Sequence, residues 1–87
     1  MTEETLLEFP CQFPIKMMGR DESGFRETVR GLVEKHTGPL DDSAVQASVS
    51  AKGNFVSVTV TVTATSRAQL DAIYRDVSAH QAVLMAL

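Results

Sequence analysis

One long stretch of the chain alternates strictly between apolar and polar residues. From residue 56 to 65, valines and one alanine occupy every even position, and serine and threonines occupy every odd position. A shorter stretch, residues 45–50, alternates in the same way. Successive side chains of a strand point to opposite faces, so this pattern predicts two strands of a hairpin, each with one buried and one wet face. Residues 51–54 form the predicted turn between them.

Two other segments carry apolar residues at the spacing of a helix. The first starts near residue 22, with Asp21 or Ser23 as its cap, and stops at the Gly-Pro pair 38–39. The second follows a capping box at 66–69 and ends near residue 80. Their predicted apolar faces are Phe25, Val29, Leu32, Val33 and His36 in the first, and Leu70, Ile73, Tyr74 and Val77 in the second.

Residues 12–18 and 83–87 complete the pattern as the first and fourth strands. On the fourth strand we expect Val83, Met85 and Leu87 to face inward. The order strand-helix-strand-strand-helix-strand is that of α+β, ferredoxin-like βαββαβ folds. Right-handed crossovers then predict a four-stranded antiparallel sheet of order 4-1-3-2 with both helices on one face. We expect residues 1–11 to be an N-terminal tail and edge segment, and 12–87 to be a single domain.

Composition narrows the classes of function. The net charge of −3 disfavours nucleic acid, whose phosphates attract basic surfaces, and it also disfavours a polybasic contact with a membrane. Cys11 is the single cysteine, so the fold does not depend on an internal disulfide. The acidic N-terminus lacks the basic and apolar segments of a secretion signal, and no apolar run approaches the length of a membrane span. We therefore expect a cytoplasmic protein.

Several short motifs are spread along nearly the whole chain. They are Leu6-Leu7-Glu8-Phe9-Pro10, Phe13, Lys16-Met17-Met18-Gly19, Lys52-Gly53-Asn54-Phe55, Ser57-Val58, Ala64-Thr65, Tyr74 and the apolar end from Val83 to Leu87. Together these motifs resemble the YbeD-like family of small bacterial proteins, a domain of unknown function. The resemblance implies a ferredoxin-like fold similar to the ACT domains, regulatory modules that bind amino acids. It implies no established activity. Bacterial genes of the family often neighbour lipoate attachment genes, which suggests a protein partner linked to lipoate metabolism.

The predicted topology gathers several polar residues at one end of the sheet, where His80 and Gln81 also lie. A glycine turn, an arginine and the N–H groups of a helix N-terminus can hold a carboxylate or phosphate, so we expect a small anionic ligand such as an amino acid here. The alternative is a turn glycine, a solvated arginine and ordinary hairpin chemistry. The candidate ligand-binding residues are Gly19, Arg20, Lys52, Gly53 and Asn54.

Enzymatic and metal sites find less support in the sequence. Gly24-Phe25-Arg26 resembles the phosphate loop of acylphosphatases, but the asparagine-bearing glycine-rich strand of those enzymes is missing. Cys11, His36 and His80 match no zinc spacing. We therefore predict a non-enzymatic protein with no catalytic residue, cofactor or metal, and keep an acylphosphatase-like hydrolase as an alternative.

The open face of the predicted sheet offers a second surface. It carries Ser57 and a row of threonines, which suits a strand exposed on one face. Only Phe55 and Lys16 suggest the aromatic rings and basic residues that RNA-binding sheets use, so RNA binding is disfavoured. Apolar Met18 joins the same face, so an interface through Met18, Thr59 and Thr61 is expected to serve a homodimer or another protein partner. The alternative function is accordingly a protein-interaction adaptor.

Overall fold

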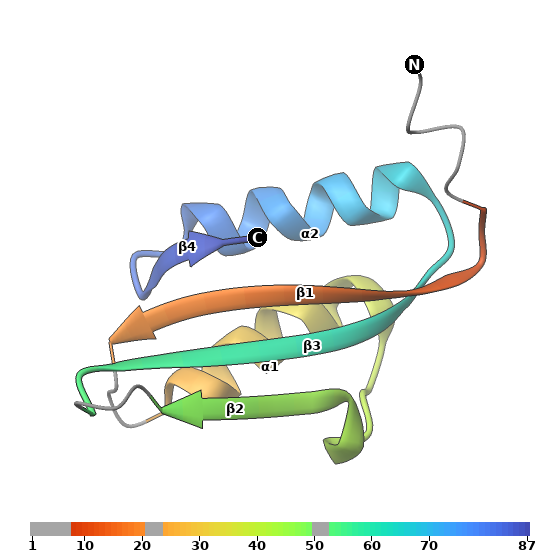
Figure 1. Ribbon diagram of the computed structural model, residues 1–87. Coiled ribbons are helices and arrows are strands. Elements are labelled where there is room, and N and C mark those ends of the chain that lie inside the picture. The colour runs from red at the N-terminus through yellow and green to blue at the C-terminus, as the bar shows by residue number, and fades with distance from the viewer. Residues whose placement is uncertain (1–7, 21–23, 50–52) are drawn as a thin grey trace.

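The alternating stretch forms the long strand β3 (Phe55–Ala64) inside a four-stranded antiparallel sheet (Figure 1). The computed structural model describes residues 8–20, 24–49 and 53–87. The strands are β1 (Cys11–Arg20), β2 (Val45–Val49), β3 (Phe55–Ala64) and β4 (Val83–Ala86). They lie in the order β2-β3-β1-β4, which is the predicted order 4-1-3-2 counted from the other edge. The predicted ferredoxin-like topology is therefore confirmed.

Two helices form the second layer. Helix α1 (Phe25–Thr37) packs mainly over β3 and β1, and helix α2 (Arg67–Ala79) packs against α1 and β4 (Figure 1). A short 3-10 turn, η2 (Asp42–Ala44), leads into β2. Among the described segments, no helix combines the length and the apolar character needed to cross a membrane.

The core is built from one face of the central strands and one face of each helix. Every apolar position of β3 from Val56 to Ala64 is buried, and Ile15 and Met17 of β1 lie beside Val60 and Val58. The predicted helix faces are confirmed, because their buried residues are Phe25, Val29 and Val33 in α1 and Leu70, Ile73 and Val77 in α2. The apolar side chains that alternate along β3 therefore pack against the apolar faces of α1 and α2 in a single core.

The predicted capping residues of α2 also connect the two helices. The Ser66 hydroxyl accepts a hydrogen bond from the Gln69 N–H at 3.0 Å, as a capping box requires. The Gln69 side chain accepts from the Thr65 N–H at 2.7 Å and donates to the His36 carbonyl at 3.0 Å. It therefore satisfies a carbonyl at the end of α1 as well. Of the caps predicted for α1, Asp21 and Ser23 lie outside the described residues.

A network of ion pairs and hydrogen bonds centred on Arg30 stabilises the loop between α1 and β2. The Arg30 guanidinium contacts the carboxylates of Asp42 at 2.5 Å and Glu34 at 3.2 Å, and donates to the Leu40 carbonyl. The Glu34 carboxylate also accepts from the Leu40 N–H, which lowers its pKa, and the Arg30 hydrogen bond lowers the pKa of Asp42. These contacts fix where β2 begins.

Strand β2 departs from the prediction that its apolar side chains are buried. Val45 is buried, but Ala47 and Val49 are exposed. The reason is the placement of α1, which covers β3 and β1 and leaves the outermost strand uncovered on this side.

The predicted facing of β4 is right for Val83 and wrong for Met85 and Leu87, which are exposed. Gly19 pairs with Val83 while Met18 pairs with Met85, so β4 contains an extra residue at this point. The extra residue shifts the alternation by one position, as a bulge does, and turns Met85 to the open face.

A hydrogen bond between His36 and Asp76 joins the outer sides of the two helices. The Nε2 atom of His36 lies 2.6 Å from a carboxylate oxygen of Asp76. A carboxylate only accepts hydrogen bonds, so His36 is the donor. This hydrogen bond is the main reason why the pKa of Asp76 lies below its ordinary value of 3.8. His36, predicted to lie at the boundary of the apolar face of α1, is partly buried there.

A carboxyl group with a lowered pKa stabilises the fold only while it is ionised. We expect the contribution of Asp76 to be complete above pH 3.8 and to disappear as the pH falls through its lower pKa in the folded protein. In His36→Ala the pKa of Asp76 should rise toward the ordinary value, because its hydrogen-bond donor is gone. NMR titration of the Asp76 carboxyl carbon measures both values, and an unchanged pKa would contradict the role assigned to His36.

Candidate ligand-binding site

The end of the sheet that carries Arg20 contains a hollow of about 310 Å³. Arg20 is the last residue of β1, and the chain between α2 and β4 passes beside it. Antiparallel pairing of β1 with β4 brings these two segments together although they are sixty residues apart in sequence. The lining residues are Arg20, His80, Gln81, Ala82 and Leu84.

Hydrogen bonds within the turn after α2 fix the position of His80 and orient its ring. The His80 N–H donates to the Val77 carbonyl, and the His80 carbonyl accepts from the Val83 N–H at 3.0 Å. The ring atom Nδ1 accepts from the Ala82 N–H at 3.1 Å, so a neutral ring carries its hydrogen on Nε2. Within the described part of the chain, that Nε2 atom has no hydrogen-bond partner. His80 can therefore donate to a bound group.

Gly19 sets how closely β4 and α1 approach this end of β1. A Cβ atom on Gly19 would lie 2.6 Å from the Ala82 carbonyl oxygen and closer still to the Phe25 ring. Real Cβ atoms do not approach other atoms so closely, so a larger residue would displace the turn that carries His80. Gly19 thus shapes the hollow without lining it.

The structure gathers only part of the predicted ligand site. Arg20 lies with His80 and Gln81, as the topology predicts. Gly53 and Asn54 precede Phe55, the residue paired with Arg20, so they lie at the same end but do not line the hollow. Lys52 is outside the described residues. Leu84 was not expected in the lining, because its place depends on the bulge in β4.

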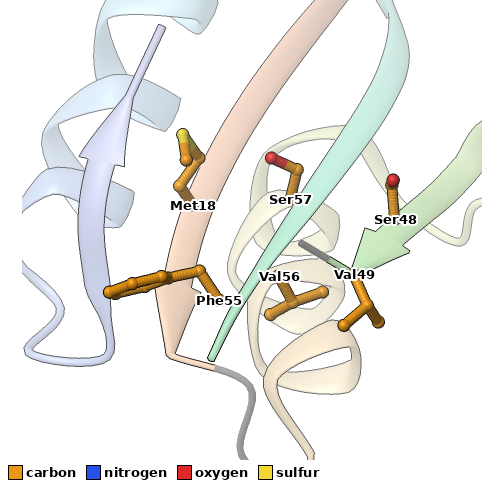
Figure 2. A pocket seen from close by; sticks show the side chains of 6 residues that line it. All are labelled: Met18, Ser48, Val49, Phe55, Val56 and Ser57. Atoms are coloured by element: carbon orange, nitrogen blue, oxygen red, sulfur yellow. The ribbon is translucent and has the colours of Figure 1, made fainter. Parts of the chain in front are cut away.

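The predicted interface residues lie on the open face of the sheet. Met18, Thr59 and Thr61 are all partly exposed there, and Met85 adds a methionine directly opposite Met18. A smaller hollow of about 100 Å³ opens between the ends of the strands (Figure 2). Its lining is Met18, Ser48, Val49, Phe55, Val56 and Ser57, none of them charged, so it does not suit an anion.

The segment that resembles an acylphosphatase loop is engaged in structural contacts. The Arg26 guanidinium, in the segment that resembles an acylphosphatase loop, contacts the Glu27 carboxylate at 2.9 Å and the Val45 carbonyl at 3.3 Å. Phe25 of the same segment is buried in the core. Over residues 8–20, 24–49 and 53–87, no three His, Cys, Asp or Glu side chains gather as metal ligands would.

Comparison with known proteins agrees with a small ferredoxin-like domain and identifies its family. A solution structure of protein HP0495 from H. pylori superposes with a TM-score of 0.71 over 93% of this chain and 85% of that chain, at 17% identity. Residues 4–87 match the family described as "Protein of unknown function (DUF493)". The chain belongs to this family, which confirms the resemblance to YbeD-like proteins.

Individual relatives match along nearly their whole length. UPF0250 protein NE1487 of Nitrosomonas europaea is 42% identical over 100% of both chains. A UPF0250 protein of Paraburkholderia phytofirmans is 46% identical over 97% of this chain and 94% of its own. Neither description states an activity or a ligand.

Substitutions at two glycines should separate close packing from helix propensity. We expect Gly19→Ala to lower the free energy of unfolding by about 1–3 kcal/mol, because the added methyl group meets Phe25 and Ala82. Gly31→Ala in α1 has open space around it and should raise the free energy by up to about 1 kcal/mol. Urea denaturation measures both. Equal effects at the two positions would contradict the close approach at Gly19.

Proposed function

We propose that the protein is a non-enzymatic regulatory module that senses a small carboxylate, such as an amino acid, in the hollow beside Arg20. The observation that carries the proposal is the meeting of an arginine, a histidine and a glutamine in one hollow of about 310 Å³. That volume is at the lower end of the range for small-molecule sites.

The donors in this hollow suit a carboxylate. A guanidinium donates two parallel hydrogen bonds to one carboxylate, and such charge-assisted bonds are stronger than neutral ones. Arg20 is exposed, and the Nε2 atom of His80 is available as a second donor. The Gln81 amide can both donate and accept. Leu84, 54% exposed, supplies an apolar contact for the remainder of the ligand.

A protein-interaction adaptor is the second candidate. It is favoured by the apolar side chains that the open face presents at one end of the sheet, where Met85 is 50% exposed beside Met18. Exposed apolar groups on a sheet face are typical of a surface that another protein covers.

Calorimetric titration with the amino acids and with small carboxylates such as succinate tests the ligand-sensing proposal. We expect at least one compound to bind, and Arg20→Gln to weaken its binding at least about tenfold by removing the charge-assisted hydrogen bonds. Arg67→Gln is the matched control, because Arg67 begins α2 and lies outside the hollow. In NMR spectra the same ligand should shift the amide signals of residues 80–84.

Two results would overturn the proposal. One is the absence of binding by every compound to the folded parent protein. The other is an equal affinity in Arg20→Gln and Arg67→Gln, which would place the ligand elsewhere.

A further inference from the structure

The pattern of backbone hydrogen bonds in the sheet shows which N–H and C=O groups of β2 point to the outer edge of the sheet. In antiparallel strands, the N–H and C=O of one residue point to one neighbour and those of the next residue point to the other. Lys16 and Leu87 exchange both hydrogen bonds, at 3.2 and 2.7 Å, so Lys16 is directed to β4. The alternate residues Ile15 and Met17 are therefore directed to β3, where their partners are Val60 and Val58.

The same alternation continues into β2. Val60 and Val58 use their backbone groups on β1, so their neighbours on the other side, Val45 and Ala47, make no backbone hydrogen bonds with them. Val49 follows in the same phase. The N–H and C=O groups of Val45, Ala47 and Val49 therefore point to the outer edge of the sheet.

The outward groups of Val45 already have hydrogen-bond partners within the chain. The Val45 N–H donates to the Asp42 carbonyl, and the Val45 carbonyl accepts from the Arg26 guanidinium at 3.3 Å. These two contacts independently confirm that Val45 is directed outward. The four outward N–H and C=O groups of Ala47 and Val49 have no hydrogen-bond partner among the residues that the structure describes.

The side chains of β2 do nothing to protect this edge. Natural edge strands are usually protected by charged residues, proline or a bulge, because an open edge pairs with other strands. The strand Val45-Gln46-Ala47-Ser48-Val49 has no charge and no proline, and its pairing with β3 has no irregularity. Val49 is 55% exposed on the face that the helices cover elsewhere, and Figure 2 shows it directed away from Ser48.

We propose that β2 pairs with β2 of a second copy of this chain, in an antiparallel arrangement that joins two sheets into one of eight strands. Only one register gives hydrogen-bond partners to the outward N–H and C=O groups of both Ala47 and Val49 in each copy. In this register Val45 keeps its contacts with Asp42 and Arg26. It places Ala47 opposite Val49 of the partner subunit, and Val49 opposite the partner's Ala47. The two-fold axis then passes between the two Ser48 residues.

Side-chain chemistry favours a second copy as the occupant. A two-fold axis perpendicular to the joined sheet keeps apolar positions with apolar ones, so each exposed Val49 meets an alanine. The strand carries no charge, so two copies of a chain with net charge −3 meet here without like charges in contact. The opposite edge, β4, is interrupted by its bulge and lines the hollow beside Arg20. This inference is independent of the proposed ligand.

Sedimentation equilibrium over a range of concentrations tests the inference. The parent protein should approach the mass of a dimer as its concentration rises. Ala47→Pro removes one outward N–H from each copy, and Val49→Lys adds like charges at the contact, so each should raise the dissociation constant at least about tenfold. Ala86→Pro, which removes an outward N–H from the β4 edge, and Thr61→Lys, on the open face, are the matched controls and should leave it unchanged.

A disulfide tests the register. In a Cys11→Ser background, Ser48→Cys should crosslink two copies on mild oxidation, because residues directly opposite at a non-hydrogen-bonded pair lie within the range of a disulfide. Gln46→Cys should not crosslink efficiently. The inference would be overturned if the parent protein stayed a monomer at millimolar concentration. It would also be overturned if the controls Thr61→Lys or Ala86→Pro lost the dimer while Ala47→Pro and Val49→Lys kept it. Preferential crosslinking of Gln46→Cys would also overturn it.

Discussion

The structure depends on the burial of one face of β3 between the sheet and the helix layer. Val58, Val60 and Val62 have no exposed surface, and Val58 and Val60 are flanked by β1 on one side and β2 on the other. Each buried valine contributes roughly 1.5–3 kcal/mol relative to an exposed one. Their spacing fixes the register, because a shift of one residue would put the threonines into the core.

Both candidate surfaces follow from what this core leaves uncovered. Helix α1 covers β3 and β1 and helix α2 packs against α1 and β4, so the outer strand β2 keeps exposed apolar side chains and outward backbone groups. At the other edge, the close approach of β4 to Gly19 brings His80 and Gln81 beside Arg20. The packed interior thus determines the fold, whereas the edges and the strand ends offer the groups that can bind something else. The two surfaces lie on opposite edges of the sheet and can be tested separately.

The sequence predicted most of the fold because its strongest signals are local. Alternation in β3 and helical spacing in α1 and α2 depend on residues a few positions apart, and the strand order followed from the handedness of the crossovers. The exposure of Ala47 and Val49 could not be predicted, because it depends on how far α1 extends across the sheet. The facing of Met85 depends on the bulge in β4 opposite Met18 and Gly19, and no local pattern in residues 83–87 encodes it. The topology located Arg20 with His80 and Gln81, but Leu84 entered the lining only through that bulge.

A matched pair of substitutions on β3 tests the central role of its buried face most directly. Val60→Thr keeps the shape of the side chain and places a hydroxyl in the core, whereas Thr61→Val makes the reverse change on the open face of the same strand. Urea denaturation should show a loss of about 1–3 kcal/mol in unfolding free energy for Val60→Thr, and a change within about 0.5 kcal/mol for Thr61→Val. Equal effects of the two substitutions, or a larger loss in Thr61→Val, would contradict this account of the core.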